Sequence, residues 1–190
     1  MKKTNSLRIT SGHLRSRRID YVPNENIRPT KSYIREVIFN VCNLDNNFNT
    51  LDLFSGSGIL TLESISRGAK VCHLVESNKK ICEKYLSECK KLNIENFMLF
   101  NCDVFKFLQR EQIQDYHLIF IDPPYKDSCL SNVLNELFQR NFVQNNKYIY
   151  FEQDRKNKDK SVCEYLKIKY DIIKDLSIGD VSYTIAQKRN

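Results

Sequence analysis

The chain has 190 residues, of which 41% are hydrophobic; this suits one folded domain with a substantial core and excludes wholesale disorder. The 30 Lys and Arg residues exceed the 23 Asp and Glu residues, which gives a net charge of +7. Residues 1–40 hold nine of the basic residues but only three acidic ones. A basic segment on a nearly neutral body favours a polyanionic partner such as nucleic acid, although a solubilising tail would have the same composition.

Cysteine usage and the lack of long apolar runs indicate the compartment. The seven cysteines form no C-x-x-C pair, and most lie within apolar runs, which is typical of small buried hydrophobes in a reducing environment rather than of disulfides or structural zinc. The N-terminal sequence lacks the apolar segment of a secretory signal, and no 18-residue apolar stretch occurs. We therefore expect a cytoplasmic protein that uses neither a metal nor a membrane.

The first predicted elements are a basic arm and a helix. In residues 7–19, apolar residues are spaced between arginines around Ser11-Gly12, which predicts a short β-hairpin or an extended arm. Thr30 is a candidate N-cap for a helix over residues 31–42, whose apolar residues recur at helical spacing. The Asn- and Asp-rich residues 43–49 form a linker. We therefore divide the chain into a basic N-terminal extension, residues 1–43, and a body, residues 44–190.

The body alternates short apolar strands with helices. Strands are predicted at 50–54, 70–75, 96–100, 117–121 and 147–151. Helices are predicted near 59–67, 77–91, 103–110 and 128–140. The charged run after Gln153 predicts a loop or a helix start, and strands near 168–175 and 181–187 predict an antiparallel hairpin at the sheet edge. This order is typical of βαβ units, so we expect an α/β fold with a mostly parallel sheet covered on both faces.

A glycine-containing turn, Asp52-Leu53-Phe54-Ser55-Gly56-Ser57-Gly58, joins the first strand of the body to the next helix. Glycines let the backbone turn tightly and approach a ligand, and the helix N-terminus offers free N–H groups. Glu76 ends the second strand, where a doubly wound sheet holds a carboxylate against ribose hydroxyls. The third glycine of the dinucleotide fingerprint is replaced by Thr61, and Asp52 could meet a charged amino-acid moiety. S-adenosylmethionine therefore fits better than NAD.

A second carboxylate, Asp103, follows the third strand of the body. It could accept a hydrogen bond from an adenine amino group. It could equally cap the next helix, a position that Asp suits well. The two roles are compatible.

The motif Asp122-Pro123-Pro124-Tyr125 directly follows the strand at 117–121 and is the most specific signal in the chain. Consecutive prolines make the backbone rigid and leave carbonyls without neighbouring N–H donors. Hydrogen bonds from an exocyclic amine to the Asp122 carboxylate and the Pro123 carbonyl would stabilise the positive charge that develops during methyl transfer. Tyr125 would stack on the base. A structural Pro-Pro loop is the alternative, but this motif and the glycine turn both follow strands of one sheet, where ligands bind.

Together these segments resemble the bacterial small-subunit (16S) ribosomal RNA guanine-N2 methyltransferases, a class I S-adenosylmethionine-dependent family. The resemblance runs from residue 8 to 188 through RITSGHLRSRRI, IRPTKSYIREVIFN, LDLFSGSGILTLESISRGA, VES, IDPPY, YFEQD and GDVSYTIAQK. It implies a Rossmann-like fold with a seven-stranded sheet and an antiparallel C-terminal strand pair. The implied cofactor residues are Asp52, Phe54, Gly56, Gly58, Glu76, Asp103 and Val104, and the implied catalytic residues are Asp122, Pro123, Pro124 and Tyr125. Ser55 and Asn78 depart slightly from the family pattern.

The resemblance also implies RNA contacts in the basic extension. Arg28 and Arg35 are candidates for binding RNA phosphate or lining the target pocket, although Arg35 could equally pair with Glu36 or a surface acid. Three further arginines are expected to contact phosphates, which gives affinity without sequence information. They are Arg15, Arg17 and Arg18.

Other conspicuous residues have structural explanations. His73 and His117 show no metal-ligand spacing and are expected to be packed strand residues. An apolar stripe at helical spacing is expected to lie in the core rather than at a cofactor. Its members are Ile81, Cys82, Tyr85, Leu86 and Cys89.

We therefore expect a monomeric enzyme that transfers a methyl group from S-adenosylmethionine to guanine N2 of 16S rRNA, in the small subunit or an assembly intermediate. A DNA adenine-N6 methyltransferase would use the same DPPY chemistry, but 190 residues leave no room for the usual target-recognition domain. A non-catalytic ribosome-assembly factor with a vestigial fold is the other alternative. The intact Asp52, Glu76 and Asp122 argue against it.

Overall fold

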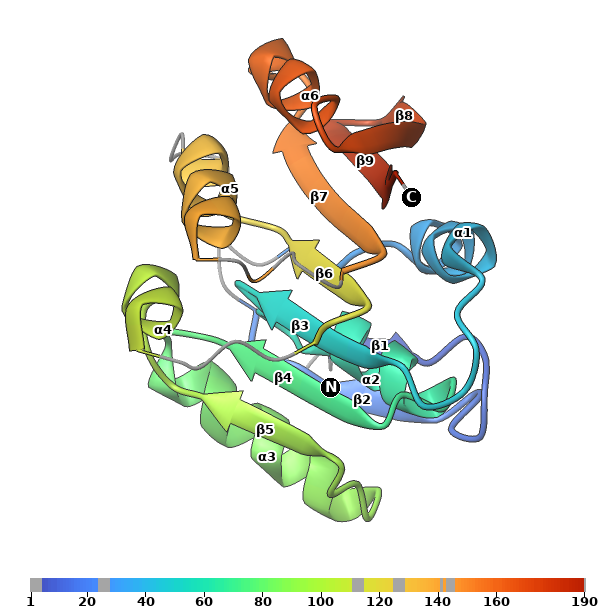
Figure 1. The fold of residues 1–190 in the computed structure, drawn as a ribbon. Coiled ribbons are helices and arrows are strands. Elements are labelled where there is room, and N and C mark those ends of the chain that lie inside the picture. The colour runs from blue at the N-terminus through green and yellow to red at the C-terminus, as the bar shows by residue number, and fades with distance from the viewer. Residues whose placement is uncertain are drawn as a thin grey trace.

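The computed structural model describes residues 5–23, 28–110, 115–124, 129–140, 142 and 146–189. Within these residues, the centre is a seven-stranded sheet in the order β5-β4-β3-β6-β7-β9-β8 (Figure 1). The strands are β3 (Asn49–Leu53), β4 (Val71–Val75), β5 (Phe97–Phe100), β6 (Leu118–Ile121), β7 (Tyr148–Asp154), β8 (Tyr170–Ile178) and β9 (Val181–Lys188). The β3 to β7 strands run parallel, whereas β9 is antiparallel to both β7 and β8. The predicted sheet and C-terminal hairpin are confirmed.

The strand positions follow from burial. All four residues of β6 are buried, as expected for a central strand covered on both faces. The first four strands of the body lie within a residue of their predicted positions. The β7 and β8 strands extend three residues further than predicted, because both pair with β9 as far as Val181.

Helices cover both faces of this sheet (Figure 1). The helices α1 (Ser32–Cys42), α2 (Ile59–Ser66) and α3 (Lys79–Lys91) pack on one face. The helices α4 (Val104–Arg110), α5 (Cys129–Gln139) and α6 (Lys160–Leu166) pack on the other. Side chains alternate along a strand, so Leu51 and Leu53 of β3 point toward α4 and α5 while Asp52 points toward α2.

The N-terminal arm, residues 5–23, contains an antiparallel pair formed by β1 (Ser6–Arg8) and β2 (Arg18–Asp20). Its buried side chains Ile9, Leu14 and Ile19 belong to the same hydrophobic cluster as Leu62 and Ile65 of α2. The arm is therefore packed on the body and shares its core. The predicted hairpin is confirmed.

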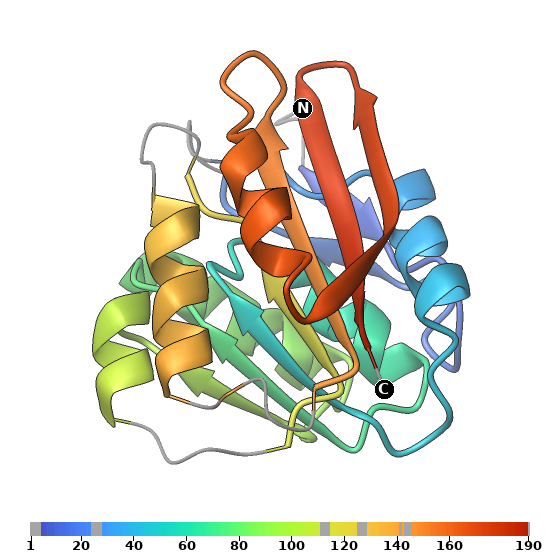
Figure 2. The same ribbon diagram turned by 45° about the horizontal axis from the view of Figure 1, so that its top comes forward.

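The helix α1 lies alongside the β8–β9 hairpin (Figure 2). Its Ile34 and Ile38 pack with Tyr183 and Ile185 of β9. The prediction that Thr30 caps this helix is wrong: Lys31 is the N-cap residue, with no side-chain capping bond. The Thr30 carbonyl instead accepts a hydrogen bond from Arg35 Nη1 at 3.2 Å.

Three further expectations concern individual side chains. The apolar stripe of α3 is in the core except for Leu86, which is 47% exposed; for this residue the prediction is wrong, because it faces away from the sheet. His73 is buried and its Nδ1 lies 2.8 Å from the Tyr116 hydroxyl. No disulfide joins the seven cysteines, all of which lie in the described residues; five are buried, whereas Cys102 and Cys129 are only partly buried.

Candidate cofactor and target site

The turn between β3 and α2 has a strained backbone. Phe54, Gly56 and Gly58 have positive φ angles of 62°, 51° and 70°. Gly58 is the N-cap residue of α2, and a Cβ atom there would lie 2.2 Å from the Tyr85 ring. Glycine is therefore required at position 58 both by backbone conformation and by packing. Phe54 is a non-glycine residue in the left-handed region, which is typical of functional sites.

Glu76 holds this turn from the neighbouring strand. It directly follows β4, and its Oε2 accepts a hydrogen bond from Gly56 N at 2.9 Å. Its Oε1 accepts one from Asn78 N at 2.8 Å. A carboxylate accepts up to about four hydrogen bonds, so these contacts orient Glu76 and leave acceptor capacity for a ligand.

Asp103 caps α4. Its Oδ1 accepts hydrogen bonds from the backbone N–H groups of Phe105 at 3.0 Å and Lys106 at 3.2 Å. The capping role considered for this residue is thus present. Its side chain also borders the cavity described next, so the capping role and a ligand role are compatible in this structure.

A cavity of about 180 Å³ opens where β3, β4, β5 and β6 end. Apolar walls flank its polar groups, an arrangement suited to a nucleoside with a charged tail. Its lining is Phe54, Gly56, Val75, Glu76, Ser77, Asn78, Ile81, Cys102, Asp103, Val104, Asp122 and Pro124. The structure thus brings together most of the predicted cofactor residues and two residues of the DPPY motif. Val75 and Cys102 were not predicted as site residues, although each adjoins a predicted one. Ile81 was predicted to lie in the core rather than at a cofactor; it is buried, but it also lines this cavity, which corrects that expectation.

Three predicted residues lie behind this lining. Asp52 is buried and accepts a hydrogen bond from Thr61 Oγ1 at 2.7 Å. Burial raises the pKa of Asp52 to about 7. Gly58 packs on Tyr85, and Pro123, which follows β6, is buried. None of the three is among the residues that line the cavity.

Asp122 stands at the end of β6 beside a second carboxylate. The parallel register pairs Ile121 with Phe151, so the next residues, Asp122 and Glu152, are neighbours on one face of the sheet. Glu152 is 2% exposed and its Oε1 accepts a hydrogen bond from the Tyr150 hydroxyl at 2.5 Å. Burial, then Glu152, then Asp52 raise the pKa of Asp122 well above its usual value. The sequence reasoning did not predict Glu152 as a site residue; only the β6–β7 register identifies it.

Tyr125, predicted to stack on the target base, lies outside the described residues. Four of the five arginines expected to contact RNA are exposed, and Arg35 is the exception. Arg28 is exposed and lies 3.8 Å from Asp180. The other exposed members are Arg15, Arg17 and Arg18.

Arg35 differs from the expectation. Its side chain is 3% exposed and its Nε lies 3.2 Å from Glu63 Oε1. A guanidinium paired inside the protein is unsuited to binding RNA phosphate, so the expected RNA role is corrected to a structural one. The partner is also not Glu36, which adjoins Arg35 in sequence but carries no ion pair to it among the described contacts.

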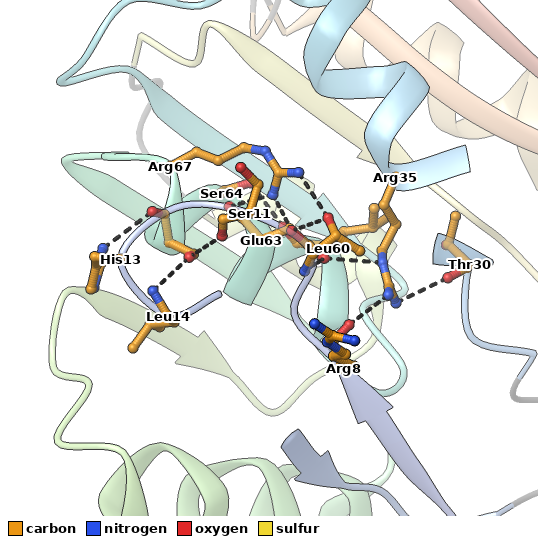
Figure 3. A network of polar contacts seen from close by, with 12 residues as sticks. Arg8, Ser11, His13, Leu14, Thr30, Arg35, Leu60, Glu63, Ser64 and Arg67 are labelled. Atoms are coloured by element: carbon orange, nitrogen blue, oxygen red, sulfur yellow. Dashed lines mark hydrogen bonds and ion pairs between the residues drawn. The ribbon is translucent and has the colours of Figure 1, made fainter. Parts of the chain in front are cut away.

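Glu63 is the centre of a buried polar network that joins the arm, α1 and α2 (Figure 3). It accepts hydrogen bonds from Thr10 N at 2.8 Å and Thr10 Oγ1 at 3.0 Å, and it pairs with Arg67 as well as Arg35. Nearby, Ser66 Oγ accepts a bond from Leu14 N at 2.9 Å. These contacts fix the arm on the helix that begins at the glycine turn.

Two other kinds of site are absent from the described residues. Among the described residues, no helix combines the length and apolarity required to cross a membrane. In the same part of the chain, no three His, Cys, Asp or Glu side chains are grouped as metal ligands.

Comparisons with known proteins place this chain in a family. The family described as conserved hypothetical protein 95 matches residues 7–187. The chain belongs to this family. Ribosomal RNA small subunit methyltransferase D of Buchnera aphidicola (subsp. Acyrthosiphon pisum, strain APS) is 35% identical over 156 residues, which cover 82% of each chain. The protein of the same name from Escherichia coli K12 is 26% identical over 194 residues, which cover 99% of this chain and 96% of the relative.

A solved structure of a candidate methyltransferase from Escherichia coli superposes with a TM-score of 0.83 at 26% identity. The superposition covers 96% of this chain and 98% of that one. The Rossmann-like methyltransferase fold and the resemblance proposed from sequence are therefore confirmed. Because the match spans nearly the whole of both chains, the family fold includes the N-terminal arm.

Proposed function

We propose that this protein transfers the methyl group of S-adenosylmethionine to the exocyclic N2 amino group of a guanine in 16S ribosomal RNA. One observation carries the proposal: a single cavity is lined both by the glycine turn with Glu76 and by Asp122 and Pro124 of the DPPY motif. A cofactor bound at the glycine turn and Glu76 would thus lie next to a base bound at the DPPY motif. The names of the relatives, which are ribosomal RNA methyltransferases, supply the substrate class.

The residues of the cavity fit S-adenosylmethionine. The Glu76 carboxylate is oriented by two backbone N–H groups and can accept hydrogen bonds from ribose hydroxyls. Asp103 borders the same cavity and can accept a bond from the adenine amino group. Ile81 and Val104 provide apolar contact for the purine ring. When bound, this cofactor supplies an electrophilic methyl group on a sulfonium.

Asp122 activates the amine. A guanine amino group is a weak nucleophile because its lone pair is delocalised, and hydrogen bonds to a carboxylate and to the Pro123 carbonyl favour the pyramidal form. The amine must also lose a proton as it gains a methyl group. The Asp122 carboxylate, whose pKa is raised by burial and by Glu152, is suited to receive that proton.

The arm supplies RNA affinity. Arg15, Arg17 and Arg18 are exposed on it, so we assign residues 1–43 to RNA binding and residues 44–190 to catalysis, within one shared core. The substrate is 16S rRNA in the small subunit or its assembly intermediate, and the enzyme acts as a monomer in the reducing cytoplasm, where its seven cysteines form no disulfide.

The test is transfer of a labelled methyl group to protein-free 16S rRNA, to small subunits and to DNA, followed by nucleoside identification. The subunits come from cells that lack this gene, so that the target is unmodified. N2-methylguanosine supports the proposal. N6-methyladenine in DNA contradicts it, and RNA binding without transfer identifies a non-catalytic assembly factor instead. The Asp122→Ala protein, purified in parallel, detects contaminating methyltransferases.

A further inference from the structure

A second and larger depression, of about 740 Å³, lies between the arm and the start of α1. One wall is formed by Arg8, Arg15 and Tyr21 of the arm, and the other by Lys31 and Tyr33 at the α1 N-terminus. We refer to it as the arm–α1 groove. It shares no lining residue with the cavity at the strand ends, and its volume is within the range of clefts that hold ligands.

The groove is built by a buried side chain. Arg35 donates a hydrogen bond from Nη2 to the Arg8 carbonyl at 2.7 Å and one from Nη1 to the Thr30 carbonyl at 3.2 Å. It therefore ties one wall to the other, and its pairing with Glu63 anchors both to α2. The walls are held at a fixed separation by contacts distant in sequence, so the groove is preformed.

The exposed lining combines positive charge with aromatic surface. Arg8, Arg15 and Lys31 are all exposed, and Glu36 is the only acidic residue in the described lining. Tyr33 is 38% exposed, a large fraction for an aromatic side chain, and Lys31 Nζ lies 6.0 Å from its ring centre. Cations beside aromatic rings are the combination that binds single-stranded nucleic acid, because phosphates pair with the cations while bases stack on the rings. An acidic peptide would use the charges but not the rings.

Both tyrosines also connect the groove with the target site. Tyr21 borders a narrow cleft that reaches Gly56 and Ser57 of the glycine turn. At the other wall, Tyr33 lies near Tyr183, where burial and then the Tyr33 phenol raise the pKa of the Tyr183 phenol. Tyr183 pairs in register with Glu152, the neighbour of Asp122. A strand lying in the groove would therefore continue toward the DPPY motif.

We propose that the arm–α1 groove binds unpaired RNA nucleotides next to the target guanine, with phosphates on Arg8, Arg15 and Lys31 and a base stacked on Tyr33. The inference rests on the proposed function and extends it. The N2 amino group of a paired guanine is engaged in the duplex, so the target must leave its stack before reaction. The groove holds the flanking strand in that unpaired form.

The experiment compares Tyr33→Leu with Tyr165→Leu, a matched control because Tyr165 is 39% exposed on α6 and lies outside the groove. The probe is a short single-stranded RNA that contains the fluorescent base 2-aminopurine, and binding is followed by fluorescence quenching. Tyr33→Leu is expected to weaken binding by about 5- to 150-fold, the effect of losing one stacked base, and to reduce the quenching. Tyr165→Leu should change neither. Equal binding by the two variants would overturn the proposal.

A second variant tests the charges without touching an aromatic ring. Lys31→Gln should reduce the slope of log affinity against log salt by about 0.7, the value for one phosphate contact on a single strand. An unchanged slope contradicts the phosphate contact. Polyglutamate serves as a competitor that carries charge but no bases. If it displaces the RNA completely from the wild type and binds Tyr33→Leu as tightly as the wild type, the partner is an acidic protein and the proposal is overturned.

These measurements separate the inference from the proposed function. Binding is measured without turnover, and S-adenosylmethionine titration of Tyr33→Leu should match the wild type because the groove and the cofactor cavity share no residue. If wild-type protein methylates no RNA, the proposed function fails whatever the groove binds. If methylation yields N2-methylguanosine and the groove variants bind and methylate RNA normally, only the groove assignment fails.

Discussion

Burial makes Asp122 and Asp52 weaker acids than ordinary carboxyl groups. Burial raises the pKa of both, and each lies near a further carboxylate. Hydrogen bonds donated by an amine favour the charged form of a carboxyl group, so a bound amine would lower the pKa that burial raises. The proton affinity of Asp122 would therefore change when its target binds.

The first prediction concerns Asp122→Ala. We expect the rate of methyl transfer to fall by at least roughly 100-fold, the cost of removing one preorganised polar group, while cofactor affinity stays within about twofold. Single-turnover assays with saturating RNA measure the rate, and calorimetric titration measures S-adenosylmethionine binding. Asp45→Ala, which removes an exposed acid, is the control. Turnover near that of the control would show that Asp122 does not orient the amine.

The second prediction concerns Asp52 and pH. Its pKa is raised from 3.8 to about 7, so the folded state holds the proton more tightly than the unfolded chain. The resulting stabilisation is complete below pH 3.8 and is lost as pH rises to about 7, in total about 4 kcal/mol by linkage. The free energy of unfolding, measured with urea, should fall between pH 5 and pH 8. This fall should be about 2–3 kcal/mol larger in the wild type than in Asp52→Asn. If the free energy of unfolding has the same pH dependence in both proteins, the raised pKa of Asp52 is contradicted.

At the scale of elements, α2 is the helix on which the site depends. All eight of its residues are buried, including Glu63 and Ser66, because the sheet covers one side and the arm covers another. Its polar side chains bond to other protein groups: Glu63 and Ser66 to the arm, Thr61 to Asp52 of β3, and Ser64 to the Leu60 carbonyl within the helix. The helix begins at Gly58, so its position sets that of the glycine turn.

The third prediction compares Gly58→Ala with Gly179→Ala. Both glycines have positive φ, 70° and 65°, so both variants incur the left-handed strain of about 1–2 kcal/mol. Only at position 58 would the new Cβ atom clash, at 2.2 Å from the Tyr85 ring; at 179 the nearest atom is Lys31 Nζ at 3.6 Å. Overpacking should therefore destabilise Gly58→Ala by about 1–3 kcal/mol more. Urea denaturation measures both, and equal losses would contradict the packing argument.

For the whole molecule, the Glu63 network makes the arm part of the body. Thr10 comes from the arm, Arg35 from α1, Glu63 from α2 and Arg67 from the C-cap of that helix, so one buried carboxylate joins three segments (Figure 3). Burying these charges is costly unless each is paired, and removing one partner leaves the others uncompensated. The network therefore holds the RNA-binding arm at a fixed place relative to the site.

The fourth prediction is that Glu63→Gln destabilises the fold by about 3–5 kcal/mol, because Arg35 and Arg67 lose their buried counter-charge. The arm should also become cleavable by trypsin at its exposed arginines at lower protease concentration. Glu83→Gln is the control, since Glu83 is exposed and pairs with Lys79 at 3.9 Å on the α3 surface. A loss of stability no larger than that of the control would contradict the role of the network.

The fifth prediction concerns the charge of the arm. Replacing Arg15, Arg17 and Arg18 with Gln should reduce the slope of log RNA affinity against log salt by about 2–3 units, or 0.7–0.9 per contact. Cofactor affinity should stay unchanged, because these exposed side chains lie outside the cavity lining. Filter binding across a salt series measures the slope. If the slope is unaltered, the RNA docks on another surface.

The sequence by itself determined the order and type of the elements and the motifs at the strand ends. Strand and helix periodicity, glycine and proline are local signals, so the sheet, the hairpin and the residues Glu76, Asp103 and Asp122 could be predicted. Tertiary structure alone decided three things: the burial of Arg35 against Glu63, the position of Glu152 beside Asp122, and the arm–α1 groove. Each joins residues far apart in the chain, and the burial and charge of a side chain depend on what packs against it, which local sequence does not contain.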